Sequence, residues 1–193
     1  SPVADMSAIL LSLGALAEIS KTRASGLERR RLPLEKFFLG YKSVDLQPGE
    51  FLSAIYIPAS SEGSEFSNSG SYDGEQNGES LTGRFEGGIG FGAKGGKLFF
   101  SFEKIAKRQA LDIAAVNTAM AFRLDDTLAR SVRISAGGVA EIPLLLPKAA
   151  ALMEGSRIKG AKAKDLAELC DTVSRMAQEE VRPIGDVRGS ALY

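Results

Sequence analysis

Hydrophobic residues recur at helical spacing at the start of the chain and then change to strict alternation. Met6, Ile9, Leu10 and Leu13 follow a Ser-Pro pair that suits a helix N-cap and first helical position, and the run ends at a glycine. The pattern predicts one short helix there. Residues 15–20 alternate as a strand, and we expect the polar, arginine-rich stretch that continues to Arg31 to be a turn facing water.

The next apolar residues fall in two short groups separated by a turn signal. Residues 33–41 predict a helical turn with aromatic anchors, and Pro48-Gly49 is typical of a turn. Residues 50–57 form a β-rich run closed by Pro58, and both of its alternating faces are mainly apolar. This pattern favours an interior strand that is covered on both sides.

Regular patterning stops between residues 59 and 97, where serine, glycine, glutamate and asparagine dominate first and glycine dominates later. The composition predicts a long loop or insertion. Residues 90–95 fit the pattern G-x-G-x-x-G, but a dinucleotide-binding loop requires a strand before it and a helix after it. Because strand-like residues follow, we expect a glycine-rich hairpin here.

Alternation returns at residue 98 and gives way to helical spacing after Pro143. Strands are predicted at 98–104, 113–124 and 131–136, with a charged turn at 104–112 and a tight turn at Asp125-Asp126. Tight turns between consecutive strands indicate an antiparallel meander. Apolar residues at 145–153 and 166–176 predict two helices, so we expect an α+β fold in which helices cover one face of a three-stranded antiparallel sheet.

The amino-acid composition excludes several kinds of catalytic and metal site but does not by itself indicate a function. The 193 residues carry 24 basic and 24 acidic side chains, so the global charge favours neither nucleic acid nor an anionic membrane. Histidine is absent and Cys170 is the one cysteine, which excludes histidine triads, histidine metal sites, cysteine-ligated clusters and disulfides within the chain. No long apolar run or signal peptide is evident, and we expect a cytoplasmic protein.

The charged turn is the strongest candidate for ligand binding. Lys104, Lys107 and Arg108 fall within five residues, between an aromatic run and a small apolar run. Such a segment is either a solvated hairpin tip or a loop that faces a ligand. Cys170, by contrast, is predicted to be a buried, inert thiol on an apolar helix face. Asp112, Asp125 and Asp126 are interpreted as turn residues, and no carboxylate pair indicates acid–base catalysis.

Six segments, in order, resemble the flavoprotein part of the xanthine dehydrogenase (molybdenum hydroxylase) family. In the family they read S-P-I-S/A-D-L, F-F-x-G-Y-R/K, L-x-P-x-E-x-L…I-P, K-x-x-x-R-x-x-x-D-I-A-x-V, V-R-I-A-x-G-G-V/M and P-I-S-D-V/M-R-x-S-A-x-Y. The matching residues here are 1–6 (SPVADM), 37–42 (FFLGYK), 46–58 (LQPGEFL…IP), 104–116 (KIAKRQALDIAAV), 132–139 (VRISAGGV) and 183–193 (PIGDVRGSALY).

The resemblance implies a domain organisation and an electron-transfer role. Residues 1–58 would be the end of an FAD-binding, PCMH-type domain, 59–97 an insertion, and 98–193 the flavoprotein C-terminal domain. In the family, electrons from a purine reach FAD through a molybdopterin centre and iron–sulfur clusters and pass to NAD⁺ or oxygen. Partners would therefore be an iron–sulfur domain and a molybdopterin-binding subunit in a higher oligomer. Flavin subunits of carbon monoxide, nicotinate or hydroxybenzoyl-CoA enzymes, and a scaffold domain without FAD, are the alternatives.

The resemblance also implies which residues meet the cofactor. Ser1 and Asp5 would make polar contacts to FAD, Leu52 would pack against the flavin ring, and Lys104 would approach it, with Arg108 in the loop beside it. A cation there is expected to raise the flavin potential, because it stabilises the negative charge gained on reduction. The family's pyrophosphate-binding segment would lie upstream of Ser1, so we expect this chain alone to hold FAD poorly.

Overall fold

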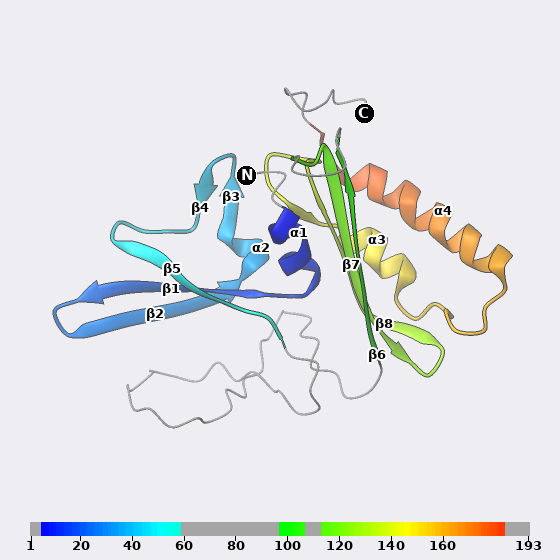
Figure 1. Ribbon diagram of the computed structural model, residues 1–193, viewed down its shortest axis with the longest axis horizontal. Coiled ribbons are helices and arrows are strands. Elements are labelled where there is room, and N and C mark those ends of the chain that lie inside the picture. The colour runs from blue at the N-terminus through cyan, green and yellow to red at the C-terminus, as the bar shows by residue number, and fades with distance from the viewer. Residues whose placement is uncertain (1–4, 59–96, 107–112, 184–193) are drawn as a thin grey trace.

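The computed structural model describes residues 5–58, 97–106 and 113–183, which form two antiparallel sheets of three or more strands, one short strand pair and four helices. Figure 1 shows the smaller sheet on one side of α1 and the larger sheet on the other. In chain order the elements are α1 (Asp5–Ser12), β1 (Leu16–Arg23), β2 (Gly26–Pro33), α2 (Leu34–Phe37), β3 (Phe38–Gly40), β4 (Ser43–Val44), β5 (Glu50–Tyr56), β6 (Lys97–Ile105), β7 (Val116–Asp125), β8 (Leu128–Gly137), β9 (Leu144–Leu145), α3 (Pro147–Met153) and α4 (Ala163–Glu180).

The predicted first helix is confirmed by α1. Gly14 follows it with φ of 69°, a left-handed conformation that glycine adopts without a steric penalty, and the backbone N–H of Ala15 donates to the carbonyl of Leu10. The chain then enters β1, whose Ala17 and Ile19 pack with Leu11 in the core of this half. The predicted strand at 15–20 is therefore also confirmed, and it runs three residues further, to Arg23.

The prediction of an arginine-rich turn at residues 23–31 is wrong, because most of that stretch is strand β2. It pairs with β1 in a regular antiparallel register from Leu16↔Pro33 to Arg23↔Gly26, and only Ala24 and Ser25 form the turn. Arginine side chains are stable on this strand because acidic groups on neighbouring strands neutralise them. A sequence pattern does not report those cross-strand partners.

The prediction that residues 50–57 form an interior strand is also wrong. The order of the smaller sheet is β2-β1-β5, so β5 is an edge strand within the described part of the chain. Its apolar residues are not all covered: Phe51 is 47% and Leu52 is 42% exposed. An apolar strand with an open edge and exposed side chains usually has a binding partner or ligand.

An ion-pair cluster links β2, β5 and the turn before β5. Arg30 lies 2.8 Å from the Glu50 carboxylate and 2.9 Å from that of Asp45. Hydrogen bonds from Arg30, and then one from the backbone N–H of Gln47, lower the pKa of Glu50 from 4.5 to about 2. Glu50 is therefore ionised at neutral and mildly acidic pH.

This shift predicts a defined loss of stability in acid. Because the pKa of Glu50 is lower in the folded chain than in the unfolded chain, its contribution is complete above about pH 4.5 and is lost as the pH falls towards 2. We expect the difference in melting temperature between the wild type and Glu50→Gln to be largest near neutral pH and to shrink below pH 4.5. Thermal unfolding of both proteins across this range measures it. A difference that is independent of pH would contradict the assignment.

The larger sheet has the order β6-β7-β8-β9, all antiparallel. The predicted meander is confirmed, but the sheet has four strands instead of three because Leu144-Leu145 pairs with β8 and does not start a helix. β7 begins at Val116 and not at residue 113, and β8 runs from Leu128 to Gly137, longer than predicted.

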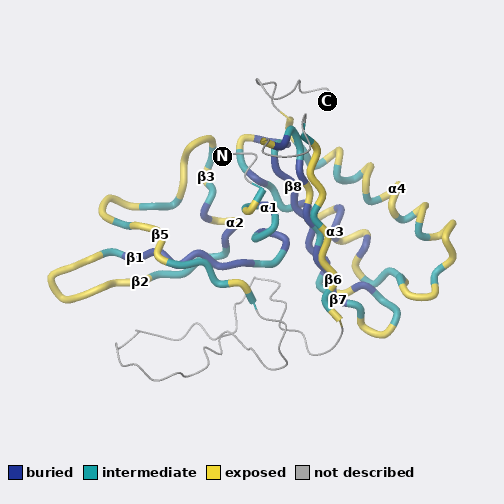
Figure 2. Tube along the Cα trace, in the orientation of Figure 1, coloured by how far each residue is buried: buried dark blue, intermediate teal, exposed yellow. Residues whose placement is uncertain are grey.

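The two faces of this sheet differ in side-chain size, and this difference decides what packs on them. On one face, large side chains of Phe122, Val132 and Ile134 form a core with α3, as the predicted helical cover requires. On the other face, small residues leave room for α1 to lie close to the sheet. These small residues are Ala119, Ala121, Ser135 and Gly137. Figure 2 shows buried residues along β8 and in α3 beside it.

The last two helices pack against each other, and α4 forms the outer layer. Partly buried Val173, Met176 and Ala177 face the core, and no residue of α4 is fully buried. Cys170 is exposed, so the prediction of a buried thiol is wrong: it lies at the edge of the apolar face, where its helical position points it away from α3. None of the described helices is long and apolar enough to span a bilayer.

Candidate functional site

A polar constellation lies where the first turn of α1 meets strands β6 and β7. One Asp5 carboxylate oxygen lies 2.8 Å from the Lys104 ammonium, and the other accepts a 2.7 Å hydrogen bond from the side-chain amide of Asn117. Asp5 lies 99 positions from Lys104 and 112 positions from Asn117 in the sequence. We call Asp5, Lys104 and Asn117 the α1–sheet triad.

Strand register brings the triad together. Lys104 on β6 is paired directly with Asn117 on β7, and cross-strand pairs share one face of a sheet. That face is the one on which α1 lies, since Ser135 Oγ donates to the Ala8 carbonyl and Arg133 Nε donates to the Leu11 carbonyl. The acidic first turn of α1 therefore meets a lysine and an amide.

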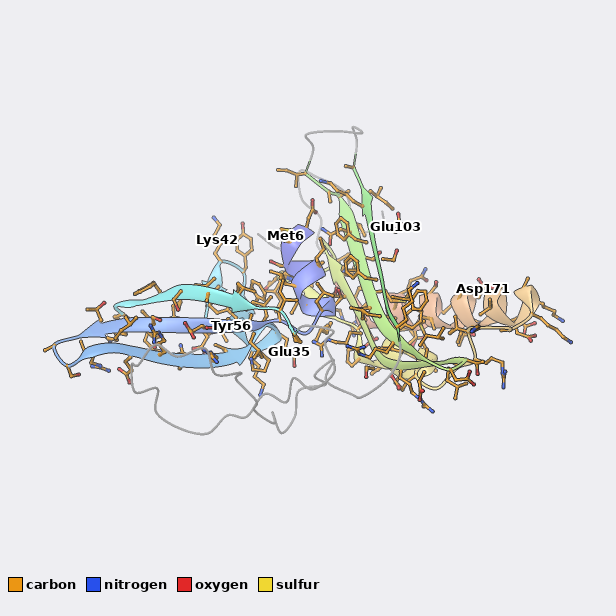
Figure 3. The ribbon with its side chains drawn as sticks, turned by 60° about the horizontal axis from the view of Figure 1, so that its bottom comes forward. Met6, Glu35, Lys42, Tyr56, Glu103 and Asp171 are labelled. Atoms are coloured by element: carbon orange, nitrogen blue, oxygen red, sulfur yellow. The ribbon has the colours of Figure 1, made fainter. Side chains whose placement is uncertain are left out.

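The triad is closed on one side and open on the other. Asn117 is 1% exposed, whereas the Asp5 and Lys104 side chains each retain 33% of their exposure. A lysine ammonium has three donors and a carboxylate has several acceptor positions, so both groups can bind a further polar ligand. Apolar side chains nearby in sequence are also exposed, among them Met6 at 62% and Ile105 at 52%. Figure 3 shows Met6 at the first turn of α1.

Of the five residues expected to contact a cofactor, the structure brings two together. Asp5 and Lys104 form the ion pair described above. Leu52 lies in the smaller sheet, opposite Ile19, with its side chain 42% exposed, and it is not part of the triad. Ser1 and Arg108 lie outside the described residues, as do Asp112, the 90–95 glycine segment and most of the 59–97 insertion.

The predicted charged turn at 104–112 begins differently from expectation. Lys104 belongs to β6, which continues to Ile105, and the backbone N–H of Ala115 donates to the Ile105 carbonyl at the base of the connection. Lys104 is thus held by a strand and is not at a free hairpin tip. The rest of that turn, residues 107–112, lies outside the described part of the chain.

Sequence reasoning missed Asn117, the buried member of the triad. It follows the motif segment 104–116 directly, and it stands in a strand of small residues at a position that faces inward. A buried polar side chain in an otherwise apolar strand usually has a specific hydrogen-bond partner, and this signal could have identified it. Its partner, Asp5, could not be read from the sequence, because that contact depends on how α1 packs on the sheet.

A second buried charge cluster lies in the smaller sheet. Glu18 is 5% exposed and accepts hydrogen bonds from Arg31 at 3.0 Å, Tyr56 at 3.0 Å and Ser53 at 3.1 Å. Arg31 also stacks over the Tyr56 ring, 4.2 Å from its centroid. Burial alone would raise the pKa of Glu18, but the hydrogen bonds from Arg31, Tyr56 and Ser53 outweigh it and the pKa is lowered. Because the Glu18 carboxylate is buried and these partners all lie in the same sheet, it is closed to a further ligand, and we interpret the cluster as structural.

A cavity of about 620 Å³ lies between α2, β8 and α3. Its charged groups are engaged with the protein: Arg133 lies 3.1 Å from Glu35, and Glu154 accepts hydrogen bonds from the backbone N–H groups of Ser131 and Val132. Ser131 has φ of 53° at a β-bulge, and the Glu154 carboxylate satisfies the donors that the bulge leaves out of the ladder. Among the described residues, no group of three histidine, cysteine or acidic side chains could hold a metal ion.

Two protein-family models match this chain. Residues 1–60 match the FAD binding domain in molybdopterin dehydrogenase, and residues 101–193 match the CO dehydrogenase flavoprotein C-terminal domain. The two segments lie on either side of the 59–97 stretch, and together they include every member of the α1–sheet triad.

Individual relatives agree with these matches. A xanthine dehydrogenase of Dictyostelium discoideum is 37% identical over 59 residues, which are 30% of this chain and 4% of that protein. Reconstituted CO dehydrogenase from Oligotropha carboxidovorans shares the fold over 100% of this chain, with a TM-score of 0.67 and 21% identity. Quinoline 2-oxidoreductase from Pseudomonas putida 86 gives 0.64 and 20% over 99% of this chain. The chain spans 51% and 50% of these two solved chains.

Proposed function

Because this chain belongs to the flavoproteins of the molybdenum hydroxylase family, with part of an FAD-binding domain followed by the flavoprotein C-terminal domain, we propose that it carries FAD in an electron-transfer enzyme. In this proposal it passes electrons from iron–sulfur clusters in a partner domain to NAD⁺ or oxygen. FAD, when bound, supplies the chemistry of accepting and donating electron pairs and single electrons. The observation that carries the proposal is the open Asp5–Lys104 pair beside exposed apolar side chains.

The residues of the triad fit a flavin nucleotide. Asp5 offers carboxylate oxygens to hydroxyl donors, and Lys104 offers an ammonium to the polar edge of a ring that becomes negative on reduction. Exposed Leu52 on β5 and Phe100 on β6 offer apolar side chains that are suited to cover an aromatic ring. Ser1 and Arg108 would extend the polar contacts, and both remain predictions.

We propose a xanthine dehydrogenase-like enzyme as the first candidate for the complete assembly. The supporting observation is the identity of 37% with the Dictyostelium xanthine dehydrogenase over 59 residues. A second candidate is an enzyme of the CO dehydrogenase or quinoline oxidoreductase type, supported by the family of residues 101–193 and by the solved structures that share the fold. In either case an iron–sulfur component and a molybdopterin component would be its partners, and substrate choice would belong to the molybdopterin component.

The test is purification of the full-length gene product together with its partner components. We expect stoichiometric FAD and a visible flavin spectrum. We also expect NADH to bleach that spectrum, because NADH would reduce the flavin in the reverse of electron transfer to NAD⁺. Anaerobic addition of xanthine, carbon monoxide or quinoline then distinguishes the two candidates, since only the correct substrate reduces the flavin through the molybdenum centre. A protein that holds no FAD, even after incubation with excess FAD, would overturn the proposal and indicate a scaffold domain.

A further inference from the structure

Asn117 is the rigid member of the α1–sheet triad. Its side chain is short and 1% exposed, and it donates the 2.7 Å hydrogen bond to Asp5. Lys104, by contrast, reaches Asp5 through a flexible four-carbon stem that remains partly exposed. A partly exposed ion pair of this kind contributes little to stability and does not hold a carboxylate in one orientation. A buried donor to a charged acceptor does so more strongly.

The Asn117 side chain fits in its position because the paired residue on the neighbouring strand is a glycine. Gly137 on β8 is the direct partner of Asn117, and a Cβ added to Gly137 would lie 2.6 Å from Asn117 Oδ1 and 3.1 Å from its Cγ and Nδ2. Any residue larger than glycine there would displace the amide. Gly138 follows with φ of 80°, and a Cβ there would lie 2.3 Å from the Ala115 carbonyl oxygen. Of the two glycines of the sequence motif, Gly137 therefore makes room for the Asn117 side chain, and Gly138 makes room for the backbone before β7.

We propose that Asn117, seated over Gly137, is a positioning residue of the flavin site: it orients the Asp5 carboxylate so that one oxygen meets Lys104 and the remaining acceptor positions face the cofactor. This inference rests on the proposed function, because it assigns Asn117 to the same site. Asn117 acts through Asp5. The row Lys104–Asn117–Gly137 crosses three adjacent strands, so the C-terminal sheet sets the geometry of a group on the FAD-domain helix.

The variants Asn117→Ala and Gly137→Ala test this inference in the full-length protein with its partners. The first removes the amide, and the second displaces it while leaving Asn117 in the sequence. We expect each to weaken FAD binding by about tenfold, the effect of losing one hydrogen bond to a charged group. Titration of deflavinated protein with FAD measures the dissociation constant, and reductive titration measures the flavin potential.

Ser135→Ala is the matched control. Ser135 also lies on β8 and also ties the sheet to α1, through the 2.7 Å bond to the Ala8 carbonyl, but it does not touch Asp5. We expect this variant to lower the free energy of unfolding while FAD affinity changes by less than about twofold. Equal losses of FAD affinity in Asn117→Ala and Ser135→Ala would mean that Asn117 is merely structural, and would overturn the inference.

A double-mutant cycle separates the inference from the proposed function. If Asn117 acts through Asp5, Asn117→Ala should have no further effect on FAD affinity in an Asp5→Ala background. If Asp5→Ala weakens binding but Asn117→Ala does not, the inference is wrong and the flavin site stands. If the wild type binds no FAD, the proposed function itself fails. Should Asn117→Ala not fold, Gly137→Ala alone and combined with Asp5→Ala gives the same cycle.

Discussion

Replacement of Glu18 with alanine is expected to lower the free energy of unfolding by about 3 kcal/mol, because it leaves a partly buried cation without its charged partner. The Glu18 side chain is 7% exposed and lies between Arg31, Tyr56 and Ser53, and Arg31 is itself only 20% exposed. Removing the carboxylate leaves the Arg31 guanidinium bonded to the Tyr56 hydroxyl but without its counter-ion, and removes the carboxylate that accepts from that hydroxyl. Urea unfolding at neutral pH measures the loss, provided that the slope of the transition is unchanged.

Glu28→Ala is the matched control for Glu18→Ala. Glu28 is in the same hairpin and pairs with an arginine at 2.6 Å, but its side chain and that of Arg23 are 60% and 54% exposed. We expect its loss to change stability by no more than about 0.5 kcal/mol. Similar losses in the two variants would contradict the conclusion that burial makes the Glu18 cluster structural.

Replacement of Lys104 with alanine is expected to lower the flavin reduction potential by roughly 30–60 mV in the complete enzyme, since 30 mV corresponds to about 1.4 kcal/mol for a two-electron couple. The change removes a positive charge and also leaves the Asp5 carboxylate, 2.8 Å from the ammonium, without its counter-ion. Both effects disfavour negative charge on the ring. Lys104→Arg retains the charge and should retain most of the potential.

Lys97→Ala provides the control for charge on the same strand. Lys97 begins β6, seven residues before Lys104, and a strand of that length separates the two positions by about 23 Å. The Lys97 ammonium lies 5.3 Å from the centre of the Phe99 ring, and it does not belong to the triad. A flavin potential that is unchanged in Lys104→Ala, or changed equally by Lys97→Ala, would contradict a flavin contact at Lys104.

The sequence predicts best the helices and strands that form because of a pattern within their own residues, without partners from distant segments. Periodicity identified α1, β1, β6 and α4, because each carries an apolar stripe with clear ends. β2 was missed because its stability comes from other strands: Arg30 is neutralised by Glu50 and Asp45, and Arg31 by Glu18. A charged strand and a charged loop look the same when the partners are distant in sequence.

Errors in burial have a similar cause. The two apolar faces of residues 50–57 indicated an interior strand, but β5 pairs only with β1 among the described strands and exposes Phe51 and Leu52. The apolar residues of a segment show that it is suited to burial, but they do not show whether this chain or another molecule buries it. Cys170 shows the opposite case, where a position at the edge of a helix stripe was assigned to the core.

The site could be predicted in part, and only through motif resemblance. Asp5 and Lys104 were identified from two separate segments, and the structure joins them at 2.8 Å. Asn117 directly follows the segment that contains Lys104, and Gly137 lies in a third segment, yet their contact depends on the register of β7 on β8. Register is a property of the assembled sheet, so no local pattern could have revealed it.

The small-residue face of the larger sheet has a consequence for how the protein moves. Three ties from α1 to this face, made by Asn117, Arg133 and Ser135, are spread over the whole length of the helix. Domains joined by a small polar interface commonly rotate against each other. Here α1, from the segment that matches the FAD-binding domain, is hydrogen-bonded near both of its ends to the sheet of the C-terminal domain. We therefore expect this interface to resist hinge bending. A redox group held at this joint would keep a constant distance and tilt relative to the rest of the protein.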